Sequence, residues 1–323
     1  MDRLDAMATL IAVVDTGSFS AAARRLATPL PTISRRIAEL ESHLGAQLLT
    51  RSTRRLALTE IGLNYVTACR RVLEDIDEAE RLASGEYSAP RGHLVIASPV
   101  GFGKLHLAPL IVDFLEAYPE VDVELRLVDV PVDLIELHID ASLRIGQLEN
   151  SSHLQMRLGA IRHVVCASPG YLEKHGVPVH PSDLSRHSCI TLTPLHAPTA
   201  WTFNTPSGDE RFPISSRMSV GNAEVAVAAA VAGLGLTRVL YYQAHKEIAE
   251  GRLKVVLDAF EPPILPVQFI YVRNRLMPLK LRAFLDFVGP PLRARVAAMT
   301  PDAIAAGERG VVIAKAATHT LHK

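Results

Sequence analysis

Near its amino terminus, the sequence predicts two short helices with only a few residues between them. The first, residues 18–27, begins with serines that can cap a helix and continues with alanines that favour one. The second begins at Pro31, whose missing N–H suits a first helical turn. Its apolar side chains recur every three or four residues: Ile33, Ile37, Leu40 and Leu44. Two helices joined by so short a turn are typical of a helix-turn-helix, whose second helix enters the major groove of DNA.

The face of the second helix opposite this stripe is small and rich in hydroxyl groups, a shape suited to a groove. It carries Pro31, Arg35, Ala38 and Ser42, flanked by Thr32 and Ser34. Beyond this helix we expect two short strands, at 47–50 and 55–58, joined by a basic tip that contains Arg51, Thr53 and Arg54. A basic tip between two short strands predicts the wing of a winged helix-turn-helix.

Positive charge is concentrated in this part of a chain that is neutral as a whole. Basic and acidic residues number 34 each, but residues 17–58 contain seven arginines and two glutamates, an excess of five positive charges. Such clustering is what binding to phosphates requires. A solvated helix pair in an unrelated core would explain each feature singly. The turn, the small exposed face and the arginine tip together favour binding to double-stranded DNA.

A long helix is predicted from Thr59, which caps it, to about residue 84. Its apolar side chains recur close to heptad spacing: Ile61, Tyr65, Ala68 or Cys69, Val72, Ile76, Ala79 and Leu82. Pairing with a second copy of the chain is the simplest cover for this stripe, and packing against its own domain is the alternative. The Gly/Pro-containing residues 85–92 then predict a domain boundary. We therefore expect a DNA-binding domain over 1–58 and a dimerisation helix with its hinge over 59–92.

From residue 93 the pattern alternates strand and helix, which predicts an α/β domain with a largely parallel sheet. A short helix is expected at 132–137 and longer ones at 104–118, 223–232 and 278–298. The domain, residues 93–298, divides into lobe I (about 93–165 and 267–298) and lobe II (about 166–266). A cleft between two such lobes is the usual place for a small ligand. Residues 299–323 show little pattern and are expected to be a poorly ordered tail.

Several functional classes find little support in the sequence. The three cysteines, Cys69, Cys166 and Cys189, lie far apart, which argues against a disulfide framework or a zinc site and fits a reducing cytoplasm. Cys166 lies among apolar neighbours, so an inert thiol is favoured over a redox pair with Cys189. The loop histidines have irregular spacing, so no metal site is expected. No signal peptide or membrane span is found.

An α/β enzyme with an accessory DNA-binding module is the alternative function. The glycine pairs at 101–103 and 233–235 lack the third glycine and the acidic partner of a dinucleotide site. No nucleophile with a matching base stands out either. We therefore expect no catalysis and no cofactor. Chemical turnover of a bound ligand would instead favour the enzyme with an accessory DNA-binding module.

Over nearly its whole length the chain resembles the LysR-type transcriptional regulators. The resemblance rests on GSFSAAARRLA, ISRRIAELESHLG, LLTRSTRRLALTEIG, RGHLVIASPVGFGKLHLAPL, DLIELHIDASLRIG and VAAAVAGLGL. It implies a winged helix-turn-helix, a coiled-coil linker helix and a two-lobed α/β effector domain like the type 2 periplasmic binding proteins. It also implies a homo-oligomer, a dimer or commonly a tetramer, on a dyad-symmetric operator.

Carried over by position, the resemblance places the DNA-binding residues on two elements. The base-reading turn holds Pro31, Thr32, Ser34 and Arg35, and the wing holds Arg51, Thr53 and Arg54. One departure concerns Leu30, which stands where the family often has a glutamine suited to adenine. Contact with a thymine methyl group is the physical option that leucine leaves.

A small-molecule effector is expected between the lobes. The turn ASPVGFG (97–103) ends a strand and opens a helix, so its N–H groups at Val100 and Gly101, with the Ser98 hydroxyl, are suited to hold an anion or carboxylate. A simple turn that needs glycine is the alternative. By resemblance, Arg144, Thr193 and Asn222 surround the mouth of the cleft.

Overall fold

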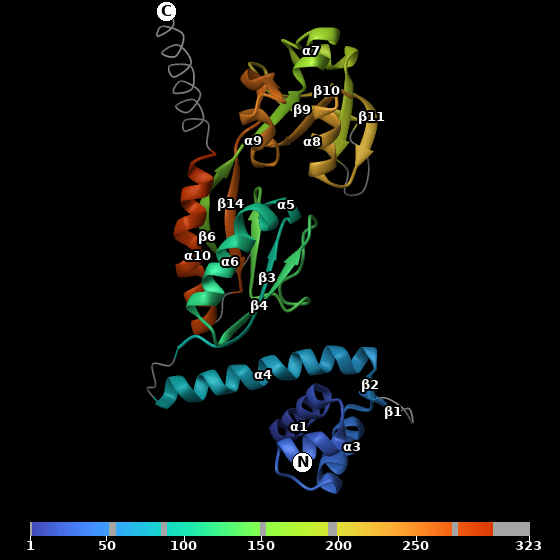
Figure 1. Ribbon diagram of the computed structural model, residues 1–323, viewed down its shortest axis with the longest axis vertical. Coiled ribbons are helices and arrows are strands. Elements are labelled where there is room, and N and C mark those ends of the chain that lie inside the picture. The colour runs from blue at the N-terminus through green and yellow to red at the C-terminus, as the bar shows by residue number, and fades with distance from the viewer. Residues whose placement is uncertain are drawn as a thin grey trace, which may run out of the picture. The chain divides into compact units, whose positions relative to one another are not determined.

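The computed structural model describes residues 2–51, 56–84, 89–148, 153–192, 199–272 and 277–299. The chain divides into two compact units, residues 1–89 and 90–323 (Figure 1). No single helix in the described ranges is long and apolar enough to cross a membrane. The helices α1 (Arg3–Thr16) and α2 (Phe19–Arg25), bent by 118° at the break between them, would together reach the length and composition of a span. Most of the predicted tail, from residue 300 on, lies outside the described residues.

Unit 1 combines helices with a two-stranded antiparallel sheet. Its elements are α1 (Arg3–Thr16), α2 (Phe19–Arg25), α3 (Leu30–Leu44), β1 (Leu49–Arg51), β2 (Leu56–Leu58) and α4 (Glu60–Ser84). α1 begins after Asp2, whose carboxylate accepts hydrogen bonds from two N–H groups, and ends at Gly17, which has a φ of 64°. Apolar stripes meet in one core: Leu10, Val13, Ile33, Ile37 and Leu40 are fully buried. The predicted helix-turn-helix is confirmed, with the strands shifted by one or two residues.

The start of α4 is fixed to the segment between α3 and β1. The Thr59 hydroxyl accepts a hydrogen bond from the Gly62 N–H (2.9 Å) and donates one to the Gln47 carbonyl (2.7 Å). The predicted cap at Thr59 is therefore confirmed. A Cβ atom at Gly62 would overlap the carbonyl oxygen of Leu48, so only glycine lets the helix approach this closely.

The apolar side chains of α4 divide between two faces. Val66 and Cys69 are buried, and Val66 belongs to the core of unit 1. Ile61 and Val72 are 57% and 41% exposed. Cys69 was expected as a possible member of the pairing stripe, and its burial corrects that assignment. The alternative prediction, that α4 packs against its own domain, is therefore correct for the face that carries Val66 and Cys69. The face that carries Ile61 and Val72 stays exposed within unit 1.

Lobe I of unit 2 is a mixed five-stranded sheet in the order β4-β3-β5-β14-β6. Its strands are β3 (Gly92–Ser98), β4 (Val121–Leu127), β5 (Ala141–Ile145), β6 (Leu154–Ile161) and β14 (Leu265–Tyr271). β3 is parallel to β4 and β5, while β14 runs antiparallel to β5 and β6. The helix α10 (Leu279–Ala297) packs on β6, as Figure 1 shows.

Two helical segments of lobe I differ from expectation. The helix expected at 104–118 is a continuous run of α5 (Val100–Phe102), a π-helix η1 (Gly103–Leu107) and α6 (Ala108–Ala117). The short helix expected at 132–137 is wrong. There the Asp133 carboxylate accepts hydrogen bonds from the N–H groups of Ile135 and Glu136, as a helix cap does. His138, however, has a φ of 53°, and the Ile139 N–H donates to the Leu134 carbonyl at 2.8 Å, so the chain stops after a single turn.

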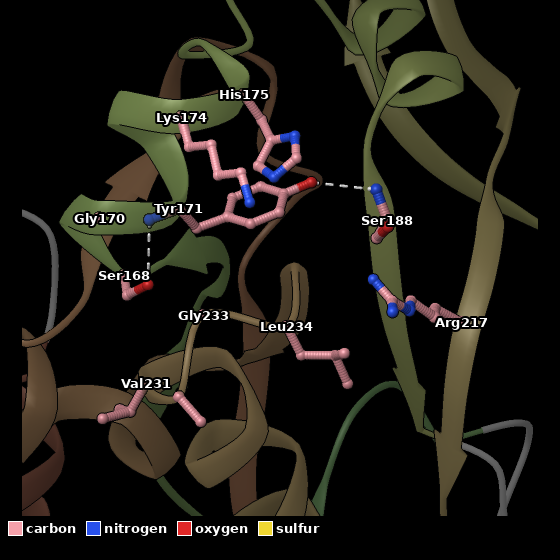
Figure 2. A pocket seen from close by; sticks show the side chains of 11 residues that line it. Ser168, Gly170, Tyr171, Lys174, His175, Ser188, Arg217, Val231, Gly233 and Leu234 are labelled. Atoms are coloured by element: carbon pink, nitrogen blue, oxygen red, sulfur yellow. Dashed lines mark hydrogen bonds between the residues drawn. The ribbon is translucent and has the colours of Figure 1, made fainter.

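Lobe II has its own five-stranded sheet, in the order β11-β8-β12-β7-β13. Its strands are β7 (His163–Ala167), β8 (Ser188–Leu192), β11 (Ser215–Val220), β12 (Leu236–Leu240) and β13 (Lys254–Val256), and a hairpin is formed by β9 (Ala200–Thr205) and β10 (Gly208–Pro213). Its helices are α7 (Pro169–His175), α8 (Ala223–Val231), α9 (Tyr241–Ala249) and the short 3-10 turns Pro181–Arg186 and Asp258–Phe260. Tyr171 of α7 ties this helix to β8, because its hydroxyl accepts a hydrogen bond from the Ser188 N–H at 3.0 Å (Figure 2).

The chain crosses between the lobes twice, and an ion pair joins the two crossings. Arg162, between β6 and β7, contacts Glu261, which precedes β14, at 2.9 Å, and the side chains are 13% and 14% exposed. The Arg162 guanidinium also lies 5.0 Å from the centre of the Tyr241 ring. One continuous cluster of buried apolar residues extends through both lobes, from Leu94 and Phe114 to Ile190.

Candidate functional site

The predicted base-reading residues lie at the start of α3, away from its buried stripe. Pro31 and Arg35 are exposed, and Thr32 and Ser34 are half-buried. The Arg35 side chain is 72% exposed, and its one ion-pair contact among described residues is Glu39 at 3.8 Å, one turn along the same helix. Such a contact is weak, so the guanidinium is available to a base edge. Leu30, the first residue of the helix, is 41% exposed.

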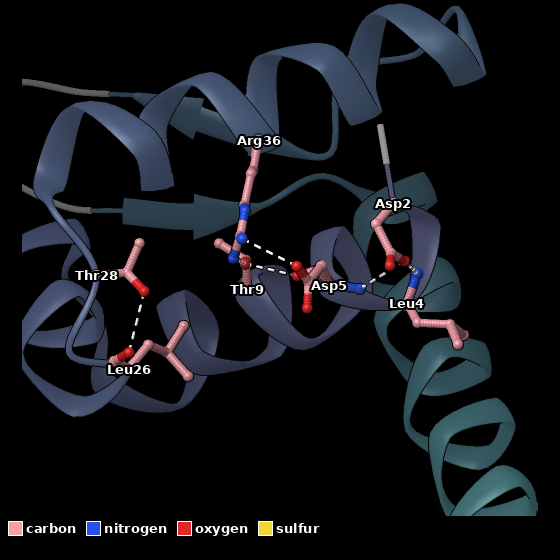
Figure 3. A network of polar contacts seen from close by, with 7 residues as sticks. All are labelled: Asp2, Leu4, Asp5, Thr9, Leu26, Thr28 and Arg36. Atoms are coloured by element: carbon pink, nitrogen blue, oxygen red, sulfur yellow. Dashed lines mark hydrogen bonds and ion pairs between the residues drawn. The ribbon is translucent and has the colours of Figure 1, made fainter.

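The turn before α3 is held by local hydrogen bonds. Ala27 has a φ of 47°, and the Thr28 N–H donates to the Ala23 carbonyl at 3.0 Å. The Thr28 hydroxyl donates to the Leu26 carbonyl at 3.0 Å, as Figure 3 shows. These contacts close the connection between α2 and α3.

Arg36, the neighbour of Arg35, has a different role. Its guanidinium contacts the Asp5 carboxylate at 2.9 Å and the Thr9 hydroxyl at 3.4 Å, both in α1 (Figure 3). Asp15 of α1 similarly pairs with Arg25 at 3.3 Å and with Arg70. The hydrogen bond from Arg70 lowers the pKa of Asp15, with the charges of both arginines acting the same way while burial opposes them.

These ion pairs change the charge count made from the sequence. Asp5 and Asp15 lie outside the window 17–58, so the window overstated the free positive charge of the folded unit. Arg25 and Arg36 hold α2 and α3 against α1, and Arg35 stays as the open cation of the α3 face. The side chain of Arg51, at the end of β1, and the residues Thr53 and Arg54 lie outside the described residues, so their DNA contacts stay predictions.

The turn 97–103 of unit 2 finds its partners inside the protein. Ser98 is 1% exposed, and its hydroxyl donates to the Pro99 carbonyl at 3.3 Å. The Val100 N–H donates to the Asp129 carboxylate at 2.9 Å. Gly101 lies against the Tyr242 ring, with a built Cβ 3.5 Å from it. An anionic ligand at this turn would therefore meet the carboxylate of Asp129 at the N–H group expected to hold it.

Two other predicted effector residues also have structural roles. The Arg144 guanidinium donates to the carbonyl oxygens of Val132 (2.8 Å) and Val130 (3.4 Å), and burial lowers its pKa. The Asn222 side chain caps α8 by accepting from the Glu224 N–H at 2.7 Å. Thr193 lies outside the described residues. The structure brings none of these described side chains into contact with Ser98.

The two lobes instead meet through groups that sequence reasoning did not single out. The rings of Phe102 and His106 lie 5.4 and 5.7 Å from the ring of Tyr242 in lobe II. Burial lowers the pKa of His106 to about 4. The Lys104 ammonium pairs with the Glu224 carboxylate of α8 at 3.0 Å. Aromatic residues make up only 5% of the chain, and that scarcity was the one signal that could have drawn attention to this cluster.

The cysteines of lobe II are suited to packing and not to redox chemistry. Cys166 and Cys189 are fully buried and free, and burial raises the pKa of each thiol to about 12. A thiol with so high a pKa carries almost no reactive thiolate at neutral pH. Within the described ranges, no group of three or more His, Cys, Asp or Glu residues is placed to hold a metal ion.

Comparison with known proteins adds to this geometry. Residues 4–63 match the lysR family of bacterial regulatory helix-turn-helix proteins, and residues 88–290 match the LysR substrate binding domain. An HTH-type transcriptional regulator of Xanthomonas campestris is 35% identical over 282 residues, which are 86% of this chain and 82% of the relative.

Two solved structures of regulators are similar over most of the chain. CrgA, a LysR-type transcriptional regulator from Neisseria meningitidis, is 32% identical with a TM-score of 0.57, covering 89% of this chain and 98% of CrgA. The full-length Vibrio cholerae virulence activator AphB is 28% identical with a TM-score of 0.56, covering 88% of this chain and 98% of AphB. The chain is therefore a member of the LysR family of DNA-binding transcriptional regulators, and not an enzyme.

Proposed function

We propose that this protein acts in the cytoplasm as a homo-oligomer that reads a dyad-symmetric DNA site with the outer face of α3. The observation that carries the proposal is the contrast between two adjacent arginines on that helix. Arg36 is held by Asp5 and Thr9, whereas Arg35 extends into solvent beside Pro31 and Thr32. An exposed guanidinium with one weak ion pair, on a small and hydroxyl-rich helix face, is suited to bidentate contact with guanine in the major groove.

The open face of α4 supports the oligomer. Ile61 and Val72 are exposed in unit 1, although the helix already packs Val66 into the core of that unit. A second copy of the same helix would cover this apolar stripe and place two α3 helices on the same DNA. Such an arrangement matches the two-fold symmetry expected of the operator.

Unit 2 supplies the response to a small molecule held between its lobes, beside the predicted residues Val100 and Gly101, where the ligand has to displace the Asp129 carboxylate from the Val100 N–H; Ser98 is buried behind this turn. The exposed Lys104–Glu224 pair crosses from one lobe to the other and contributes little to stability, so a ligand can replace it at small cost. Effectors act through their differential affinity for two states, typically about 1–3 kcal/mol. We therefore expect the effector to alter DNA bending or footprint length without abolishing binding.

The test of DNA reading uses two matched variants of the full-length protein. Selection from random duplexes first gives the preferred DNA site, and mobility shifts then compare it with single-base variants. Arg35→Ala should lose about 1–3 kcal/mol on the preferred site and relax the preference at one base pair per half-site. Arg36→Ala is the control, because it removes the same side chain from the inner position, and it should keep the base preference. If both variants keep the wild-type preference, α3 does not read DNA through Arg35.

A further inference from the structure

Lobe II contains a hollow of its own, about 470 Å³ in volume, within the lobe and apart from the turn 97–103. It lies between α7, the strands β8 and β11, and the turn that follows α8 (Figure 2). A volume of this size is in the range of pockets that hold small molecules. No predicted effector residue is among the described residues that line it.

The hollow has basic side chains in its lining. Lys174 and His175 come from α7 and Arg217 from β11, and Figure 2 shows Lys174 and Arg217 on opposite sides of the hollow. Among the described lining residues none is acidic, and neither Lys174 nor Arg217 forms an ion pair with any described residue. Two cations that converge from different elements without a carboxylate favour an anion between them.

The rest of the lining fits an organic anion. The Ser168 hydroxyl accepts from the Tyr171 N–H at 3.4 Å, which leaves its own proton to donate. The Tyr171 hydroxyl is held in place by the Ser188 N–H and by His187 Nδ1, at 3.0 and 3.2 Å. Val231 and Leu234 line another part of the hollow and offer apolar surface to a carbon skeleton.

The backbone of the hollow is shaped by a glycine turn. Gly233 has a φ of 83°, a conformation that favours glycine, and a Cβ built there would point at the Ser168 hydroxyl from 3.6 Å. The glycine thus keeps the space in front of Ser168 open.

We propose that this hollow binds a small organic oxyanion, a phosphate ester or a carboxylate, between Lys174 and Arg217. It is a second ligand site of the regulator, separate from the interlobe effector site. The oxyanion group of the ligand accepts hydrogen bonds from the two cations and from the Ser168 hydroxyl, while the carbon skeleton of the ligand contacts Val231 and Leu234. The proposal does not depend on how unit 1 reads DNA.

Calorimetric titration of the full-length protein tests this site, with inorganic phosphate and succinate as separate probes at constant ionic strength. Trp201, the single tryptophan of the chain, lies in the same buried cluster as Tyr171, so its fluorescence gives a second readout. We expect saturable binding of at least one probe, with one site per chain. Saturation by phosphate assigns a phosphoryl group and saturation by succinate assigns a carboxylate.

The variants decide where the probe binds. Lys174→Gln with Arg217→Gln removes two charge-assisted contacts and should weaken binding about tenfold or more. Lys246→Gln with Arg211→Gln is the control, because it makes the same changes at exposed positions of lobe II outside the hollow, and it should bind like wild type. The proposal is overturned if neither probe saturates, if the hollow variant binds as tightly as wild type, or if the control weakens equally.

Discussion

Replacing Arg162 with methionine tests how far the ion pair between the lobe crossings stabilises unit 2. The pair is nearly buried, with Arg162 and Glu261 in contact at 2.9 Å. Methionine keeps the length of the arginine stem but not the guanidinium, so the variant loses the charge together with its contact on the Tyr241 ring. Glu261 would then be left in a site where burial already raises its pKa even with Arg162 present.

The size of the effect follows from that burial. Removing one partner of a buried pair costs about 3–5 kcal/mol, because the other charge is left without compensation. Arg238 also lowers the pKa of Glu261 and partly replaces the lost partner, so we expect the lower end, about 3 kcal/mol. For a unit of this size, that loss corresponds to a fall in melting temperature of about 6–12 °C. Replacing both residues, Arg162→Met with Glu261→Leu, should recover most of it, since apolar isosteres of buried pairs are often neutral.

Thermal unfolding of the full-length protein, followed by tryptophan fluorescence, measures this loss. Trp201 is the single tryptophan and lies in lobe II, so the signal reports unit 2. The loss in Arg162→Met should shrink as the pH falls, because Glu261 becomes protonated and no longer carries a buried charge. The reasoning is refuted if Arg162→Met melts within about 2 °C of wild type at neutral pH, or if the double variant is less stable than the single one.

Three further predictions concern other parts of the chain. Gly62→Ala should destabilise unit 1 by about 1–3 kcal/mol in denaturant titrations, because its Cβ would overlap the Leu48 carbonyl; an unchanged midpoint would mean that α4 shifts freely. Ile76→Asp places a carboxylate in the predicted pairing stripe of α4 and should lower the mass measured by light scattering, whereas a wild-type mass would remove that stripe from the interface. His106 and His163 have pKa values lowered by burial to about 4, below the unfolded value of about 6.5. Their stabilisation of unit 2, at most about 3 kcal/mol each, should be complete above pH 6.5 and lost as the pH falls to 4; a melting temperature constant over this range would contradict it.

Local signals in the sequence were enough for the DNA-binding unit. The apolar spacing around Ile33 and Ile37 and the cap at Thr59 act over a few residues, so helices and strands could be predicted to within one or two positions. The contact between Arg36 and Asp5 could not, because it joins residues 31 apart whose proximity depends on how α1 packs. A charge window along the sequence therefore counted Arg36 as free.

The effector unit shows the same limit more strongly. The turn at 97–103 is where the sequence placed it, but its partner Asp129 comes from a different strand end, and no local pattern joins the two. The hollow in lobe II depends on Lys174 and Arg217, which separate elements bring together. The expected helix at 132–137 stops after one turn because His138 adopts a left-handed conformation, with a φ of 53°, that closes the turn at its far end.

The buried cluster that runs through both lobes bears on how unit 2 unfolds. Since Leu94 and Phe114 of lobe I share one core with Ile190 of lobe II, each lobe depends on the other to cover part of its apolar residues, and the unit should melt as a single cooperative transition. A ligand bound anywhere in this unit then stabilises all of it, by about 2.7 kcal/mol at a concentration one hundred times its dissociation constant. Thermal-shift screening of metabolites on the intact regulator would therefore detect occupants of either lobe in one experiment.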